Sequence, residues 1–341
     1  MTARPESRGV EGIDPPVGHP LQHPVRRFVD ANRAALGALS VLVVMTAIFI
    51  AANPHVFLGW NIYRSVLTTL PVTLFLVVPL VFVVTAGEID LSFPATMGLS
   101  AWIFALVVQA GFNPVVGLAA ALVTGTLLGA LVGALVVYFR LSSLIATLGM
   151  NFMLRGVIEI GAQGKSIALV SLARGWARSV FAGVAFGVPI QVIWALTFVA
   201  FSSLLFNRNR FGAHVKIVGD NPDSARQMGI DVNAVRITTF VFVGLGAALA
   251  GFFSTMIDFT WWATSGDGYL LPALASVFVG GTPTWGGVGT VAGGAIGALI
   301  VSLIQTGIVG AGLSGFYVQF FNGLIIIISL IGHRWNQIRY R

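Results

Sequence analysis

Two acidic residues and a serine stand between long apolar stretches in the segment "VTAGEIDLSFPATMG". Glu88, Asp90 and Ser92 lie where the run 65–87 meets the run 91–139, and neither run contains a charged residue. Carboxylates and hydroxyls accept hydrogen bonds from polar ligands, and carboxylates also offset the positive end of a helix dipole. Two interpretations stay open: these side chains contact a polar substrate, or they only cap the helix that starts near Ser92.

The composition of the chain decides which kind of protein must position these residues. Of its 341 residues, 56% are hydrophobic and 9% are charged, whereas soluble domains carry about 25% charged residues. The expected fold class is therefore an all-α polytopic membrane protein. Cys is absent and the five His are scattered, so we expect no metal site, no cofactor and no enzyme active site. The net charge of +7 does not indicate nucleic acid, because the basic residues lie at the ends of apolar runs.

The apolar pattern predicts about ten membrane segments and two polar tails. A membrane helix needs about 20 apolar residues, so the eighth segment is a half-helix, followed by irregular backbone at "GGTPTWGGVG". Residues 1–33 form a polar tail predicted to be disordered, and residues 334–341 form a C-terminal tail. The membrane domain covers 34–333, with segments near 34–52, 64–86, 92–110, 114–138, 141–160, 189–206, 236–256, 270–282, 288–309 and 316–332.

The positive-inside rule predicts the orientation of this domain. With ten segments, both termini lie on the same side. Fourteen of the 19 Lys and Arg residues then fall on the side of the termini, and five fall on the other. We therefore predict that the N- and C-termini are cytoplasmic.

One sequence pattern occurs twice. The stretch "TAGEIDLSFPA" from Thr85 resembles "TSGDGYLLPA" from Thr264, and each runs from Thr through a small residue, Gly and an acid to Pro-Ala and an apolar helix. Five segments separate the copies, so the second is turned upside down relative to the first. Inverted repeats of this kind place the substrate path near the middle of the membrane, at interrupted helices.

Three further residues are candidates for that path. Asn151 in "TLGMNFMLRG" is an amide inside the fifth segment, which either bonds another helix or contacts substrate. Thr282 and Trp285 lie in "GGTPTWGG", where irregular backbone at membrane depth must face protein or a cavity. The substrate pathway therefore comprises Glu88, Asp90, Ser92, Asn151, Thr282 and Trp285. Trp261 and Trp262 are expected in the aromatic belt, with a lip around the substrate as the alternative.

A polar loop at 207–236 is predicted on the cytoplasmic side. Within it, "GDNPDSARQMG" has the signals of a short helix: a capping residue, Pro222 in its first turn and a glycine at its end. Its small apolar face and acidic start favour docking into a partner protein over lying on lipid. The residues expected to form this docking site are Gly219, Asp220, Asn221, Ala225, Met228 and Gly229.

Three stretches together resemble a known family. "GEIDLS", "GDNPDSARQMGIDV" followed by "FVGLGAALAGF", and "ASVFVGGTPTWGGVGTVAGGAIGALI" are similar to the permease subunit of bacterial ABC sugar importers of the ribose, xylose and arabinose type. The resemblance runs from about residue 40 to the C-terminus. It implies a homodimeric channel in the bacterial inner membrane, two cytoplasmic ATPase subunits and a periplasmic sugar-binding protein. It also implies a fold similar to the vitamin B12 importer class.

The chain departs from the family pattern at informative places. Glu88 stands where the family often has a second glycine, while Leu270 and Pro272 stand where the family often has acids. These departures leave the sugar open among pentose, hexose and polyol, and one interpretation is that Glu88 compensates for the acid missing from the second copy.

One alternative function remains open, a carrier driven by protons or sodium without an ATPase. Such a carrier needs a relay of ionisable residues inside the membrane. The chain offers few candidates, all near predicted segment ends: Glu88, Asp90, Arg155, Glu159 and Asp258. The large polar loop at 207–236 would then have no role.

Overall fold

The computed structural model describes residues 33–185 and 187–339. A helix forms at each of the ten predicted positions, within a few residues at most ends. The predicted tail 1–33 lies outside the described residues apart from Arg33, which begins the first helix, and the last helix continues into the predicted C-terminal tail. The helices are α2 (Arg33–Ala52), α4 (Trp60–Thr85), α5 (Phe93–Gln109), α6 (Pro114–Tyr138), α7 (Ser143–Ala162), α9 (Ile190–Arg208), α12 (Val232–Asp258), α13 (Leu270–Val279), α14 (Val291–Gly310) and α15 (Phe316–Arg339).

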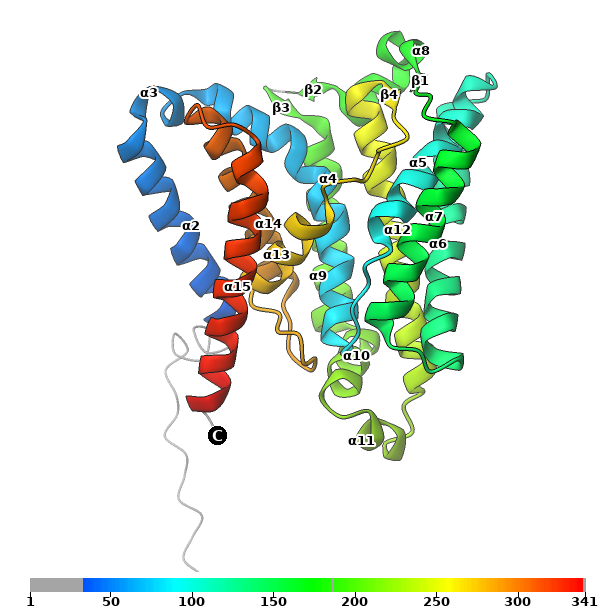
Figure 1. Ribbon diagram of the computed structural model, residues 1–341, viewed down its shortest axis with the longest axis vertical. Helices are drawn as coiled ribbons and strands as arrows, with labels where there is room; N and C mark the ends of the chain where they lie inside the picture. The colour runs from blue at the N-terminus through cyan, green and yellow to red at the C-terminus, as the bar shows by residue number, and fades with distance from the viewer. Residues whose placement is uncertain (1–32, 186, 340–341) are drawn as a thin grey trace, which may run out of the picture. The chain divides into compact units, whose positions relative to one another are not determined.

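Short elements connect these helices at both ends of the bundle. Strand β1 (Ile167–Ala168) pairs antiparallel with β4 (Thr260–Trp261), and β2 (Val184–Ala185) pairs with β3 (Val188–Pro189). These strands lie at the upper end in Figure 1, which we call the β4 end. The opposite end carries α11 and is called the α11 end. The remaining elements are α3 (Pro54–Phe57), α8 (Val170–Arg174), the π-helical turn η1 (Arg178–Ala182), α10 (Arg210–Asp220) and α11 (Pro222–Gln227).

Six of the described helices are long and apolar enough to cross a membrane. They are α4, α6, α7, α9, α12 and α14. Helix α5 has 17 residues and α13 has 10, so α13 is shorter than a bilayer requires. The half-helix predicted from residue 270 is therefore present, and it ends at Val279.

Helix α4 forms the core of the bundle. Its sequence is apolar on all sides, and a helix of that kind must be surrounded by other helices. It packs against α9, α12, α13 and α14, and its side chains are buried from Leu70 to Thr85. Pro71 and Pro79 lie inside it, and each removes one backbone donor from the helix.

Helices α6 and α12 approach each other closely through glycines. A Cβ on Gly125 would collide with the carbonyl oxygen of Gly244, and a Cβ on Gly129 would collide with that of Phe240. Small residues spaced four apart allow such backbone contact between membrane helices. This pair supports the wall of the bundle on the side of α7 (Figure 1).

Three irregular segments connect the helices that matter for the site. Segment A (residues 86–92) runs from the α11 end to the start of α5, and segment B (residues 259–269) runs from the β4 end to the start of α13 (Figure 1). Segment C (residues 280–290) follows α13. Gly87 and Gly266 have positive φ angles of 85° and 92°, a conformation that glycine adopts without strain. The two copies of the sequence pattern therefore share a local backbone turn at equivalent positions.

Backbones from three parts of the chain meet at Gly219, the residue before the end of α10. The amide of Gly287 in segment C donates to the carbonyl oxygen of Thr85 at 2.8 Å. A Cβ on Gly219 would collide with that carbonyl oxygen and would lie 2.6 Å from the Gly287 nitrogen. The glycine is therefore required by space, and it joins α10 to the end of α4 and to segment C.

Candidate functional site

The acids of segment A are held within the protein. Asp90 Oδ1 accepts hydrogen bonds from the backbone amide of Ser92 at 2.7 Å and from its hydroxyl at 2.6 Å. Asp90 and Ser92 are both buried. Ser92 occupies the N-cap position of α5, but its side chain makes no capping bond to the helix. The expected serine cap is therefore wrong, because the hydroxyl donates to Asp90 instead.

Glu88 pairs with an arginine of a different helix. Its Oε1 lies 3.1 Å from Arg236 Nε near the start of α12, and the glutamate is 8% exposed. The two side chains border a polar cleft of about 660 Å³ at the α11 end, which we call cleft A. Its other lining residues are Val136, Val137, Tyr138, Arg140, Leu141, Arg226 and Asn233. Cleft A therefore concentrates positive charge, and Glu88 neutralises part of it.

Helix α7 holds segment A from the side. The amide of Ile89 donates to Ser143 Oγ at 3.2 Å, and Thr147 Oγ1 donates to the Ile89 carbonyl at 3.4 Å. Asn151 lies one turn further along α7, and its buried Oδ1 has no hydrogen-bond partner among the described residues. An unsatisfied buried amide oxygen is costly, so both interpretations of Asn151 stay open.

Thr282 and Trp285 lie on segment C. Thr282 is fully buried, and its Oγ1 has no hydrogen-bond partner among the described residues. Trp285 is 43% exposed, and it directly precedes Gly286, which approaches Gly87 and Gly219. Segment C therefore brings both residues to the junction with segment A. The predicted pathway residues of segments A and C are neighbours at the α11 end, while Asn151 stands on α7.

The predicted docking helix is present as α11. Asn221 caps it by accepting from the amides of Asp223 and Ser224, both at 3.0 Å. Gly229 has φ of 78° just after its end, as the glycine stop predicts. Met228 is 66% exposed, whereas Ala225 is fully buried.

The position of Ala225 corrects one expectation. This residue was predicted to lie in an interface with a partner, yet it packs within the chain because the apolar side of α11 faces α10 and α12. Gly219 is likewise occupied by contacts within the chain. The exposed residues of the predicted set that a partner can reach are Asp220, Asn221, Met228 and Gly229.

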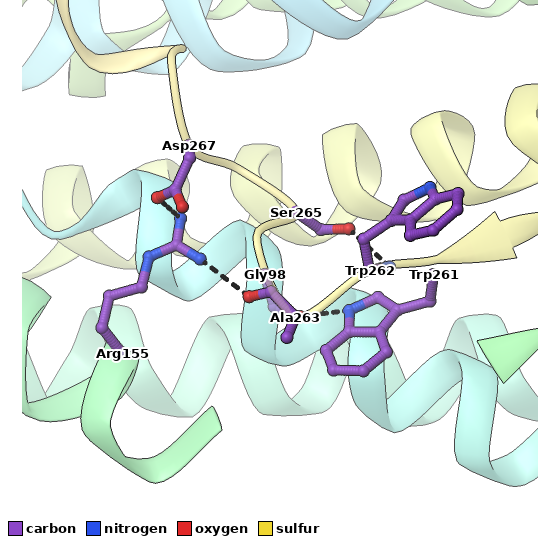
Figure 2. A network of polar contacts seen from close by, with 7 residues as sticks. All are labelled: Gly98, Arg155, Trp261, Trp262, Ala263, Ser265 and Asp267. Carbon is purple, nitrogen blue, oxygen red and sulfur yellow. Dashed lines mark hydrogen bonds and ion pairs between the residues drawn. The ribbon is translucent and has the colours of Figure 1, made fainter. Parts of the chain in front are cut away.

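Segment B carries its own acid–arginine pair (Figure 2). Asp267 forms an ion pair with Arg155 of α7, and Arg155 Nη1 donates to the Ala263 carbonyl at 3.2 Å. In the repeated pattern, Asp267 occupies the position of Glu88. The second copy therefore has an acid at Asp267, three residues before Leu270 and five before Pro272, although the departures at those two positions had suggested that the acid was missing.

Trp261 corrects a second expectation. It is fully buried, its indole nitrogen donates to the Gly98 carbonyl at 3.0 Å, and its ring stacks on Trp102 with centroids 5.6 Å apart. Figure 2 shows Trp261 turned toward α5, with Trp262 on the other side of the strand. Trp261 therefore anchors segment B to α5 instead of standing in an aromatic belt, while Trp262 is half exposed.

A second cleft, which has polar side chains among apolar ones in its lining, was missed by sequence reasoning. It has a volume of about 600 Å³, lies beside segment B and the start of α13, and is called cleft B. The sequence indicated this cleft only weakly. The signal consisted of the hydroxyl residues Ser65, Thr69 and Thr73, spaced four apart on α4, and of the adjacent polar pair Gln305 and Thr306 in the otherwise apolar α14. Its lining residues are Ser65, Thr69, Thr73, Asp267, Gly268, Tyr269, Pro272, Gln305, Thr306, Val309, Gly315 and Val318.

Two of the candidate relay residues, Glu88 and Arg155, are each held in an ion pair. Glu88 pairs with Arg236 beside cleft A, and Asp267 pairs with Arg155 beside segment B. Within the described ranges, no three His, Asp or Glu residues lie close enough together to hold a metal ion. The fold and the site thus define a multi-pass membrane protein in which irregular segments and polar clefts interrupt an apolar helix bundle.

Comparison with known proteins places the chain in a family. Residues 62–330 match the family described as "branched-chain amino acid transport system / permease component". The chain therefore belongs to this family of transport permeases, as the three glycine-rich stretches predicted. Permease components of transport systems are not themselves enzymes, so family membership confirms that this chain is a transport subunit.

Individual relatives cover nearly the whole chain. It is 30% identical over 311 residues to the ribose import permease protein of Escherichia coli (strain K12), covering 90% of this chain and 95% of the relative. It is also 30% identical to the D-allose transport system permease protein of the same strain, covering 86% and 88%. The autoinducer 2 import system permease protein of Salmonella typhi is 28% identical, covering 89% and 86%. No solved structure matches the chain.

Proposed function

We propose that this chain is the transmembrane channel subunit of an ATP-driven importer for a monosaccharide that a periplasmic binding protein delivers. Its similarity over nearly the full chain to import permeases for ribose and D-allose carries the proposal. Membership in a permease family favours this function over a carrier that works without an ATPase. Because the sugars of the relatives differ, the proposal leaves pentose, hexose and polyol open.

The proposed partners follow from the arrangement of the α11 end. Helix α11 is capped and polar on its exposed side, and it follows directly on α10, whose Gly219 contacts the end of α4 and segment C. We assign it to docking of a cytoplasmic ATPase subunit. Two copies of the chain are proposed to form the channel, with one ATPase subunit below each copy, in the bacterial inner membrane.

The proposed topology has ten membrane segments, cytoplasmic termini and an inverted repeat, as in the vitamin B12 importer class. Two features support the repeat. Gly87 and Gly266 share a positive φ, and Pro94 and Pro272 each lie in the first turns of the helix that follows. Segments A and B start from opposite ends of the bundle (Figure 1), as an inverted pair requires.

Reconstitution tests the function directly. The full chain is reconstituted in proteoliposomes with the ATPase and the binding protein proposed as its partners, and uptake of radiolabelled ribose, allose and arabinose is measured. We expect uptake of at least one sugar that requires ATP and the binding protein and that ignores proton and sodium gradients. Uptake driven by a gradient without ATP would reject the proposal and support the carrier.

A further inference from the structure

Cleft B contains polar side chains that nothing within the described chain satisfies. Thr73 is 7% exposed, and its side-chain hydroxyl makes no hydrogen bond to another described residue, although the residue lies within helix α4. Threonines in helices usually donate to the carbonyl four residues earlier, and Thr68 and Thr197 do so at 2.8 Å. The side chains of Gln305 and Thr306, which also line the cleft, have no hydrogen-bond partner in the described part of the chain either.

The start of α13 adds backbone donors to the same cleft. The N-cap position is Tyr269, and no side chain caps the helix there. The first amides of a helix have no partner within the helix. In α13 these are the amides of Leu270 and Leu271, which lie in sequence between the lining residues Tyr269 and Pro272. The buried and unbonded Thr73 is independent of this helix, because it belongs to α4. Two separate elements therefore offer hydrogen bonds to the same space.

The charge of cleft B indicates which ligands fit it. Its lining includes one charged residue, Asp267, and that carboxylate is already paired with Arg155. Burying the ammonium and carboxylate groups of a zwitterionic amino acid is costly unless each is paired and hydrogen-bonded, which favours a free carboxylate beside the ammonium group and a donor beside the carboxylate. The helix start supplies a donor, but the acid is occupied. Hydroxyl, amide and backbone groups instead match a ligand that both donates and accepts hydrogen bonds without net charge.

We infer that cleft B is a binding site for an uncharged polyhydroxylated solute, contacted by Thr73, Gln305, Thr306 and the first turn of α13. This inference rests on the proposed function and identifies a place in the chain where the sugar is bound during passage. It also separates a sugar from a branched-chain amino acid, which is the substrate class in the description of the matched family.

Cysteine protection tests this binding site in the full chain alone. The protein contains no cysteine, so single cysteines can be placed without background reaction. Thr306→Cys and Gln305→Cys are prepared in lipid nanodiscs, and their rate of reaction with a water-soluble maleimide is measured while D-ribose or L-leucine is titrated. Ser166→Cys, on an exposed loop at the β4 end, serves as the control. Two cleft positions are used so that one misfolded variant does not end the test.

We expect D-ribose to slow the reaction in the cleft at least about twofold, as occupancy at its dissociation constant requires. Neither ligand should slow Ser166→Cys, and L-leucine at equal concentration should slow none of the three. If D-ribose protects neither cleft position, the titration is repeated with allose and arabinose. The inference is overturned if none of the three sugars protects either position, or if L-leucine protects them equally well.

Transport by the reconstituted importer supplies a second test. Thr306→Val removes a hydroxyl from the cleft, and Thr197→Val removes one that bonds its own helix at the exposed surface of α9. We expect Thr306→Val to lower sugar uptake about threefold or more, since one hydrogen bond to the ligand is lost, and Thr197→Val to leave it unchanged. Equal uptake by both variants contradicts the inference. Loss of ATP dependence in the wild type would instead reject the proposed function, while cysteine protection would still stand.

Discussion

Segments A and B share a sequence pattern and a backbone turn, but they face different kinds of space. In segment A, Glu88 meets an arginine of α12 and Asp90 is closed off by Ser92. In segment B, Asp267 is 57% exposed while paired with Arg155. Cleft A is lined by three arginines and cleft B by hydroxyls and an amide. The first copy, segment A, therefore has buried and paired acids near α11. The second copy, segment B, borders a cleft whose one acid is partly exposed to solvent.

This difference shows that a repeated sequence pattern determines the local backbone geometry but not the residues that its acids pair with. A glycine with positive φ, an acid and a proline recur at matching positions of both copies. The arginines that pair with the two acids come from α7 and α12, and each lies far from its acid in the sequence. The use of each copy therefore depends on tertiary contacts, and the following changes test where those contacts matter.

The largest effect is expected at Gly219, where α10 contacts the end of α4 and segment C. Gly219→Ala places a methyl group against the Thr85 carbonyl and the Gly287 amide, which are backbone atoms that no rotamer change can move. We expect the free energy of unfolding to fall by about 3 kcal/mol, at the upper end of the cost of overpacking. Thermal unfolding in detergent measures it. Gly149→Ala is the matched control, because nothing lies within 4 Å of the new methyl group, and unchanged stability in both variants would contradict the junction.

The next effect concerns the exposed side of α11. Met228→Asp places a charge on a residue that is 66% exposed, so the chain should fold normally while losing contact with the ATPase. Truncating or charging an interface contact costs about 2–4 kcal/mol of binding, and co-purification with the ATPase measures it. Ala225→Arg, in contrast, should destabilise the chain itself because Ala225 is buried within it. If Met228→Asp co-purifies with the ATPase as well as the wild type does, the proposal that α11 docks the ATPase is contradicted.

The ion pairs of the two segments should differ in strength. Glu88→Gln leaves Arg236 without its partner in a mostly buried place, and we expect the free energy of unfolding to fall by about 2 kcal/mol. Asp267→Asn should cost about 0.5 kcal/mol or less, because that acid is more than half exposed to solvent. Denaturation of the two variants in parallel measures both losses in the free energy of unfolding. Equal losses would show that the two ion pairs contribute equally to stability.

The smallest effect is expected at the start of α5. Ser92→Ala removes the hydroxyl that donates to Asp90 at 2.6 Å, but the backbone amide of residue 92 still donates to the same carboxylate. We expect a loss of about 1 kcal/mol. Thr96→Val, which removes a hydroxyl bonded only to the carbonyl of its own helix at 3.1 Å, is the control. A larger loss for the control would mean that the Asp90–Ser92 contact does not support segment A.

Much of the fold could be predicted from the sequence because it depends on local patterns. Apolar runs located the long helices, the short eighth run located α13, and the signals in "GDNPDSARQMG" located α11 and its cap at Asn221. These features depend on hydrophobicity, helix caps and glycine turns, which act over a few residues.

The site could be predicted only in part because its contacts join distant residues. Glu88 and Arg236 form an ion pair although they lie far apart in the sequence, and no local signal links them. Ala225 was misplaced because the apolar side of a short helix looks the same whether it covers a partner or its own chain. Cleft B was missed because Thr73 and Gln305 are single polar residues in apolar helices, and their convergence depends on how α4 and α14 pack.

The glycine junction has a consequence for how force passes through the protein. Where side chains lie between two elements, rotamer changes can absorb a small displacement. At Gly219 the backbones of α10, α4 and segment C touch with no side chain between them. Packed backbone has low compressibility, so this point has almost no mechanical compliance. A displacement of α10 at Gly219 therefore passes to the ends of α4 and segment C without an intervening side chain to absorb it.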